Sequence, residues 1–220
     1  MEHTMHGKGR GRAGTEVYRR RSWLLTLALA AALAVPAVRQ AVAHPHVWID
    51  AAVRLVMQEH AIAAMQISWT FDDFYSSLIL EDFDQDGDGT LNAAELAVIA
   101  QSQQEEDLAS FSYFTHIRFG DRRHKVTFVE DFRAAFADGL LTFTFTVPMP
   151  TKVDPAVTPF AFSLHDPEYY IDIGIDRRAP VSFVGEAPSG CQPVVVEDED
   201  DPIYYGMVYP TLVQLRCDVG

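Results

Sequence analysis

The sequence Leu141-Thr142-Phe143-Thr144-Phe145-Thr146-Val147 alternates large apolar side chains with threonine. A period of two places all the apolar side chains on one face of a β-strand. Threonine is β-branched and fits a pleated, half-buried surface. Asp138-Gly139, just before this stretch, is typical of a tight hairpin turn. The stretch therefore predicts a half-buried strand in a β-rich domain.

The same alternation recurs along the chain. Apolar positions alternate from Val47 to Met57 and again from Ala61 to Phe71, which predicts a hairpin with its turn at Gln58-Glu59-His60. Further strands are predicted at 160–164, at 169–175 and at about 207–217. Pro148, Pro150, Pro155 and Pro159 predict a linker between strands. Short strands with turn signals favour an antiparallel, β-sandwich-like body.

One region changes period. From residue 72 to about residue 110, apolar residues recur at helical spacing on both sides of an acidic segment. We therefore predict an α+β fold, with a helix-loop-helix insertion at 72–110 in the β-sandwich-like body.

The acidic segment matches the EF-hand signature D-x-[DN]-x-[DN]-G-x5-E in full. Calcium takes about six to eight hard oxygen ligands, which an EF-hand loop supplies from alternate positions. Gly89 stands where such a loop turns sharply, and Leu91 where it contacts the core. The predicted calcium ligands are Asp84, Asp86, Asp88, Thr90 through its carbonyl, Asn92 through a water, and Glu95 as a bidentate carboxylate.

The alternative is an acidic turn that is merely solvated. The mutual repulsion of three aspartates favours the metal-bound loop. Since the sequence holds a single loop of this kind, a structural calcium site is favoured over a switch that opens a groove.

Residues 1–43 have the pattern of a secretory signal peptide. Basic residues at 19–21 precede an apolar segment from Trp23 to Val38, and Ala41-Val42-Ala43 is a small-x-small cleavage site. The alternative is an N-terminal membrane anchor. Both the general secretory and the twin-arginine routes fit the basic residues. We expect a periplasmic or secreted domain of residues 44–220, cleaved after Ala43, with no transmembrane segment left.

The charge excludes one class of partner. Without residues 1–43, the chain keeps 10 of its 17 Lys and Arg and 29 of its 31 Asp and Glu, a formal net charge of −19. Such a surface repels nucleic-acid phosphates. It fits a cation as partner, and the alternative is a surface that is merely soluble.

Cys191 and Cys217 are the two cysteines of the chain. In an oxidising compartment they allow one intramolecular disulfide, which we predict. The alternative is two free buried thiols.

Cleavage would leave His44 as the first residue and His46 close behind it. A terminal histidine offers an amine and an imidazole, which suit nickel, cobalt, zinc or copper. The alternative is a frayed tail. His60, His116, His124 and His165 could supply further ligands. The sequence contains no nucleophile elbow, P-loop, HExxH or dinucleotide motif, so we predict no enzyme.

These features together resemble an uncharacterised bacterial family. They are the signal peptide, Ala43-His44-Pro45-His46-Val47-Trp48, the Phe71–Leu96 helix-loop-helix, Tyr113-Phe114-Thr115-His116 and the Asp166-Pro167-x-Tyr169-Tyr170 segment. Members of that family are described as the periplasmic component of an ABC-type transport system, often beside NicO-type nickel/cobalt transporters. The resemblance implies an accessory or substrate-binding role beside an inner-membrane metal transporter.

Three functional hypotheses follow. The first is an exported, calcium-binding accessory of transition-metal transport. The second is a calcium-stabilised structural or adhesion module with no transition metal. The third is a copper enzyme with an N-terminal histidine brace.

Overall fold

The computed structural model describes residues 45–104 and 108–218. The predicted signal peptide and His44 lie outside the described residues. No helix within the described ranges is long and apolar enough to cross a membrane.

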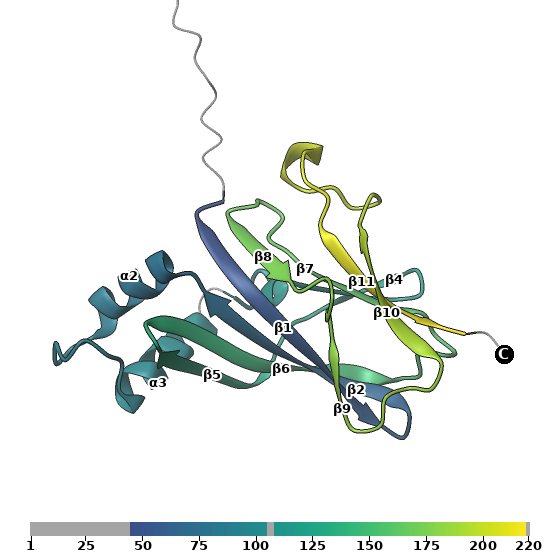
Figure 1. Cartoon of the computed structure of the whole chain (residues 1–220), viewed down its shortest axis with the longest axis horizontal. Helices are drawn as coiled ribbons and strands as arrows, with labels where there is room; N and C mark the ends of the chain where they lie inside the picture. Colours follow the sequence, from purple (N-terminus) through teal and green to yellow (C-terminus); the bar gives the residue numbers. More distant parts are fainter. Residues whose placement is uncertain (1–44, 105–107, 219–220) are drawn as a thin grey trace, which may run out of the picture. The chain divides into compact units, whose positions relative to one another are not determined.

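Within the described residues, eleven strands form two sheets, whose arrangement Figure 1 shows. The first sheet has the order β5-β6-β2-β1-β8, and β9 also pairs with β1. Its strands are β1 (Val47–Gln58), β2 (Ala61–Phe71), β5 (Glu130–Ala137), β6 (Leu140–Val153), β8 (Ile171–Ile175) and β9 (Ser182–Val184). The second sheet has the order β10-β11-β7-β3-β4. Its strands are β3 (Thr115–Phe119), β4 (Arg122–Lys125), β7 (Phe160–Leu164), β10 (Cys191–Glu197) and β11 (Thr211–Cys217).

The two sheets share one hydrophobic core. Alternate residues of β1, β2 and β6 are buried, as the period of two requires. Trp69 of β2 packs edge-on against Phe145 of β6, with 4.8 Å between ring centroids. Phe160 and Phe162 of the second sheet are equally buried in the same cluster. The β-rich α+β class predicted from the sequence is therefore confirmed.

The predicted hairpins form. β1 and β2 pair antiparallel across a turn in which Glu59 and His60 have φ of 52° and 64°. β5 and β6 join through Asp138 and Gly139, at φ of 54° and 80°. Two successive left-handed residues give the turn whose twist matches that of the flanking strands.

On the side of β1 away from β2, the strands pair in parallel and not in the predicted antiparallel direction. β8 pairs with β1 in parallel, with Val47 opposite Ile171, and β9 pairs in parallel further along, with Leu55 opposite Phe183. Parallel pairing is possible because a long connection through both sheets separates these strands in sequence.

The predicted proline linker is wrong in its first half. β6 continues through Pro148 and Pro150 to Val153. Pro148 lies opposite Ala64, beside an irregularity of the β2–β6 register, where the loss of an N–H is tolerated. Pro155 and Pro159 do lie in the connection that follows.

The composition of the acidic run at 197–201 predicts a solvated loop, and the run is solvated in part, since Glu197, Glu199 and Asp200 are exposed whereas Asp198 is buried. Asp198 is 2% exposed, and both of its carboxylate oxygens accept hydrogen bonds from the guanidinium of Arg118. Asp201 accepts a hydrogen bond from Arg123 at 2.5 Å. The run thus pairs with β3 and β4, because a buried carboxylate needs a cationic partner.

Two helices interrupt the strands after β2, as predicted. They are α2 (Asp73–Phe83) and α3 (Ala93–Ser102), and both lie beside β5 and β6 (Figure 1). Ile79 of α2 and Ile99 of α3 are buried in the common core. The hydroxyl of Ser76, fully buried, accepts a hydrogen bond from the Leu141 amide of β6 at 3.0 Å. The helix pair is therefore fixed to the sheet by apolar and polar contacts.

The predicted disulfide joins Cys191 of β10 to Cys217 of β11. The two residues face each other in the antiparallel pair that they close. The bond closes a covalent loop between two residues that are 26 positions apart in the sequence.

We predict that removal of this disulfide lowers the free energy of unfolding by about 3.5 kcal/mol, because the unfolded chain regains loop entropy. Urea unfolding of the chain and of the Cys191→Ser/Cys217→Ser variant measures the difference. Reductant should destabilise the parent chain and leave the double variant unchanged. Equal stability of the parent with and without reductant would contradict the prediction.

Candidate metal site

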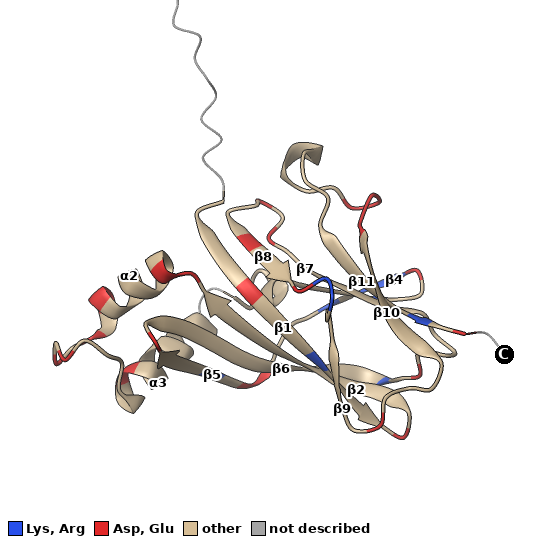
Figure 2. Ribbon diagram, in the orientation of Figure 1, with Lys and Arg blue, Asp and Glu red and all other residues tan. Residues whose placement is uncertain are grey.

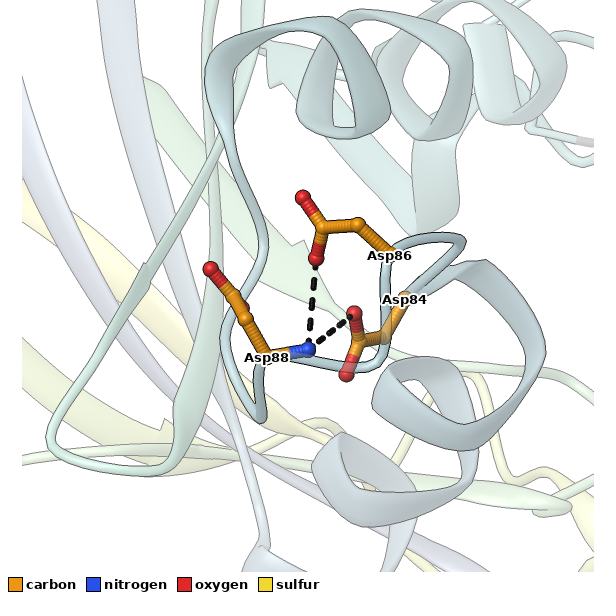
Figure 3. Close-up of side chains that lie close together, drawn as sticks. All are labelled: Asp84, Asp86 and Asp88. Atoms are coloured by element: carbon orange, nitrogen blue, oxygen red, sulfur yellow. Dashed lines mark hydrogen bonds between the residues drawn. The ribbon is translucent and has the colours of Figure 1, made fainter.

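Three aspartates meet in the loop between α2 and α3 (Figure 3). Asp84, Asp86 and Asp88 each offer a carboxylate oxygen, and these oxygens lie within 4.8 Å of one another. Asp84 is half-buried, and the other two are exposed. Three like charges at this distance repel one another unless a cation lies between them.

Backbone amides organise the loop around Asp84. Its Oδ1 accepts hydrogen bonds from the amides of Gly87 at 2.8 Å and Asp88 at 3.2 Å, and its Oδ2 accepts one from Gly89 at 2.9 Å. Gly87 and Gly89 have φ of 70° and 83°, where a Cβ would be strained. The Gly89 amide is the main cause that lowers the pKa of Asp84, and partial burial opposes it. The carboxylate is thus held ionised.

The second half of the loop continues this pattern. The Thr90 amide donates to Asp88 Oδ1 at 2.9 Å, and the Asn92 side-chain amide donates to Asp86 Oδ2 at 3.4 Å. Asn92 Oδ1 accepts from the amides of Ala94 and Glu95 and caps α3. Residues at the predicted ligand positions therefore also fix the conformation of the loop through hydrogen bonds within it.

Glu95 holds the two ends of the loop together. Its side chain is 4% exposed, and its two oxygens accept hydrogen bonds from the amides of Gln85 at 2.8 Å and Asn92 at 2.9 Å. It lies outside the close group of three aspartate oxygens. Glu95, Asn92 and Asp86 nevertheless line one pocket of about 290 Å³. Each carboxylate oxygen has a second lone pair, so a cation in this pocket is compatible with the amide contacts.

The donor set consists of oxygen atoms only. Carboxylates and amide carbonyls suit hard cations such as calcium and magnesium, whereas zinc, nickel and copper prefer nitrogen and sulfur. The loop can therefore hold a hard divalent cation.

His46 lies apart from this loop. Its amide donates to the Tyr170 carbonyl at 2.8 Å, and its ring packs against the Tyr170 ring with 4.7 Å between centroids. Within residues 45–104 and 108–218, it belongs to no group of three or more candidate metal ligands. The structure does not describe His44, its predicted co-ligand.

Two of the remaining histidines are brought together. The rings of His116 and His165 stack at 3.8 Å with an interplanar angle of 7°. The His116 Nε2 lies 3.1 Å from the His165 carbonyl, and the His165 Nδ1 lies 2.9 Å from the Ser163 hydroxyl. No local pattern could reveal this pair, because His116 lies in β3 and His165 follows the end of β7, 49 residues further along the chain.

Both rings are held neutral. Burial, and then the adjacent His116, lower the pKa of His165 to about 3. Asp201 opposes this shift, and Arg118 and Arg123 add to it. Burial also lowers the pKa of His116.

The comparisons with known proteins place the chain in a family. A family model described as "Protein of unknown function (DUF1007)" matches residues 28–209. The chain belongs to this family.

The chain is also similar to an uncharacterised protein. The "Uncharacterized 15.5 kDa protein in trpE 3'region" of Spirochaeta aurantia is 33% identical over 132 residues, which are 59% of this chain and 91% of that protein. No solved structure matches the chain.

The His116–His165 pair predicts acid sensitivity. Below about pH 6.5 an unfolded chain takes up a proton at His165, whereas the folded chain resists protonation until about pH 3. Between about pH 6.5 and pH 3, the protonation of His165 in the unfolded chain therefore lowers the free energy of unfolding by up to about 1.4 kcal/mol for each unit by which the pH falls. Urea unfolding at pH 7.5, 6 and 5 should show a steeper loss for the parent than for His165→Gln, which cannot take up the proton. Parallel pH profiles would refute the assignment.

Proposed function

We propose that the loop Asp84–Glu95 binds one calcium ion and that the ion stabilises an exported protein. The observation that carries the proposal is the close group of three aspartate oxygens, at the first three ligand positions of a complete EF-hand motif. A solvated acidic turn would gain nothing from bringing these charges together.

The ligand set follows from the motif. Asp84, Asp86 and Asp88 supply carboxylate oxygens, Thr90 supplies its carbonyl, Asn92 acts through a water, and Glu95 closes the set. The pocket lined by Asp86, Asn92 and Glu95 supports this assignment, because it places a concave space between both halves of the loop.

The site is structural in this proposal. Leu91, in the middle of the loop, is 5% exposed and belongs to the common core. EF-hand loops ordinarily pair with a second loop, and here the β5–β6 end of the first sheet supports the helix pair. A helix pair fixed in this way has little freedom to open. Calcium then stabilises the fold by mass action, by about 2.7 kcal/mol at a hundredfold excess over the dissociation constant.

The transport part of the proposal has a different support. The sequence resemblance favours a periplasmic accessory of a nickel, cobalt or zinc transporter, with His44 and His46 as candidate ligands. Within the described residues, His46 belongs to no group of three or more candidate ligands, whereas three aspartates of the loop form one, so the geometry supports the calcium site further than the transition-metal site.

We predict that the chain from residue 44 onward binds one calcium ion and melts at a higher temperature in millimolar calcium, because exported modules bind at roughly 10⁻⁴ to 10⁻³ M. Asp86→Asn and Glu95→Gln should weaken binding by about tenfold or more. Isothermal titration and thermal melts measure both effects. Glutamine is compatible with the capping position of Glu95, so the helix start should survive.

Asp82→Asn is the matched control, because it removes one exposed charge from α2 just before the loop. It should leave the calcium affinity within about twofold of the parent, since exposed charges interact weakly. The proposal fails if millimolar calcium leaves the melting temperature unchanged, or if Asp86→Asn and Glu95→Gln both bind calcium as the parent does.

A further inference from the structure

A second pocket lies between two loops of the β-body, away from the metal site. Its volume is about 540 Å³, and Pro167, Glu168, Tyr170, Tyr204 and Tyr205 line it. The first loop connects β7 to β8, and the second contains the short 3-10 helix η3 (Tyr204–Gly206) between β10 and β11. The Tyr204 amide donates to the Pro167 carbonyl at 3.2 Å, which joins the two loops. A pocket of this size suits a small ligand.

The backbone around the pocket is strained. Tyr169, Tyr204 and Tyr205 have φ of 55°, 47° and 58°, in the left-handed region that bulky residues avoid. Each such residue costs conformational free energy relative to an ordinary conformation. Tyr205 is nonetheless 96% exposed, so no core packing offsets its cost. Strain that persists without a packing benefit is typical of ligand sites.

The surrounding structure holds the first loop in place. Asp166 is 5% exposed, and its carboxylate accepts hydrogen bonds from the amides of Glu168 at 3.0 Å, Tyr170 at 2.9 Å and Ile171 at 3.2 Å. Three amide donors satisfy this carboxylate inside the loop. The pocket therefore has a rigid wall before any ligand arrives.

The pocket is negative. Among the described residues that line it, Glu168 is the one that carries a charge, and none is Lys or Arg. Figure 2 shows acidic segments and no basic ones on the two loops. The faces of tyrosine rings carry the negative end of the ring quadrupole and attract cations. Three tyrosines and one carboxylate thus combine π-faces with a counter-charge.

We propose that this pocket binds a small organic cation, a ligand with an ammonium or alkylated ammonium group. The cation packs against the rings of Tyr170, Tyr204 and Tyr205, with Glu168 as the counter-ion. Sugars also stack on aromatic rings, but they gain nothing from the charge of Glu168, so the observations favour the cation. A metal ion is disfavoured as the ligand, because the lining residues include a single carboxylate, whereas a hard cation takes about six or more oxygen ligands.

The test uses choline and its uncharged isostere 3,3-dimethylbutan-1-ol on the chain from residue 44 onward. The two probes match in shape, so only the charge differs. Choline should shift the tyrosine ring signals in ¹H–¹³C NMR spectra in a saturable manner, and the isostere should bind at least about fivefold more weakly. Glu168→Gln should weaken choline binding about two- to fivefold, and added salt should reduce the effect.

Variants of Tyr205 separate binding from folding. Tyr205→Phe keeps the ring and should bind choline within about twofold of the parent. Tyr205→Leu should weaken binding about two- to fivefold. Tyr205→Gly should do the same while the melting temperature stays equal or rises, because glycine relieves the left-handed strain. Tyr209→Leu, at a half-exposed tyrosine that does not line the pocket, is the control and should bind as the parent does.

Two results would overturn the proposal. Equal binding of choline and the neutral isostere would show an apolar pocket with no preference for charge. Unchanged choline affinity in both Glu168→Gln and Tyr205→Gly would show that the pocket is not the binding site.

Discussion

The Asp72 carboxylate joins the three elements on which the metal site depends. It accepts hydrogen bonds from the Trp48 amide of β1 at 2.8 Å and from the Tyr75 amide of α2 at 2.9 Å. The Asp72 amide in turn donates to the Trp48 carbonyl at 2.9 Å. One residue thus ends β2, caps α2 and ties both to β1. The direction of α2 follows from this junction, and Ser76 then fixes the helix to β6. The position of the acidic loop is a consequence of both contacts.

Much of the first sheet could be predicted from the sequence, because its long strands are buried on one face. The alternation in 47–57, 61–71 and 141–147 corresponds to β1, β2 and β6. In the second sheet, the predicted strands at 160–164 and at about 207–217 correspond to β7 and β11, whereas β3, β4 and β10 were not predicted. The sequence of β4, Arg-Arg-His-Lys, carries no apolar pattern at all. Its strand conformation comes from pairing with β3, which is a tertiary effect. The strand at 169–175 was predicted and corresponds to β8, but its parallel pairing with β1 was not, since pairing direction is set by a distant connection.

The metal site shows the same division between local and distant information. The motif predicted that Asp84, Asp86 and Asp88 come together, because the spacing within a short loop determines it. The hydrogen bonds of Glu95 to Gln85 and Asn92 depend on how the loop closes, and spacing alone did not reveal them. The composition of the acidic run did not predict that Asp198 is buried. Its neighbours in sequence suggest solvent, whereas its partner Arg118 is on another strand.

The pairing of β1 with β8 has a consequence for the order of folding. β1 can join β2 through a tight turn, and β6 can join β5 in the same way, as soon as those residues are available. Val47 to Ala51 must wait for Ile171 to Ile175, and non-local pairings of this kind form slowly. Until then, one edge of β1 presents unpaired amide and carbonyl groups to any other chain nearby. During folding, the first strand can therefore pair with another chain until β8 has formed. A high concentration of unfolded chains would favour aggregation through that edge.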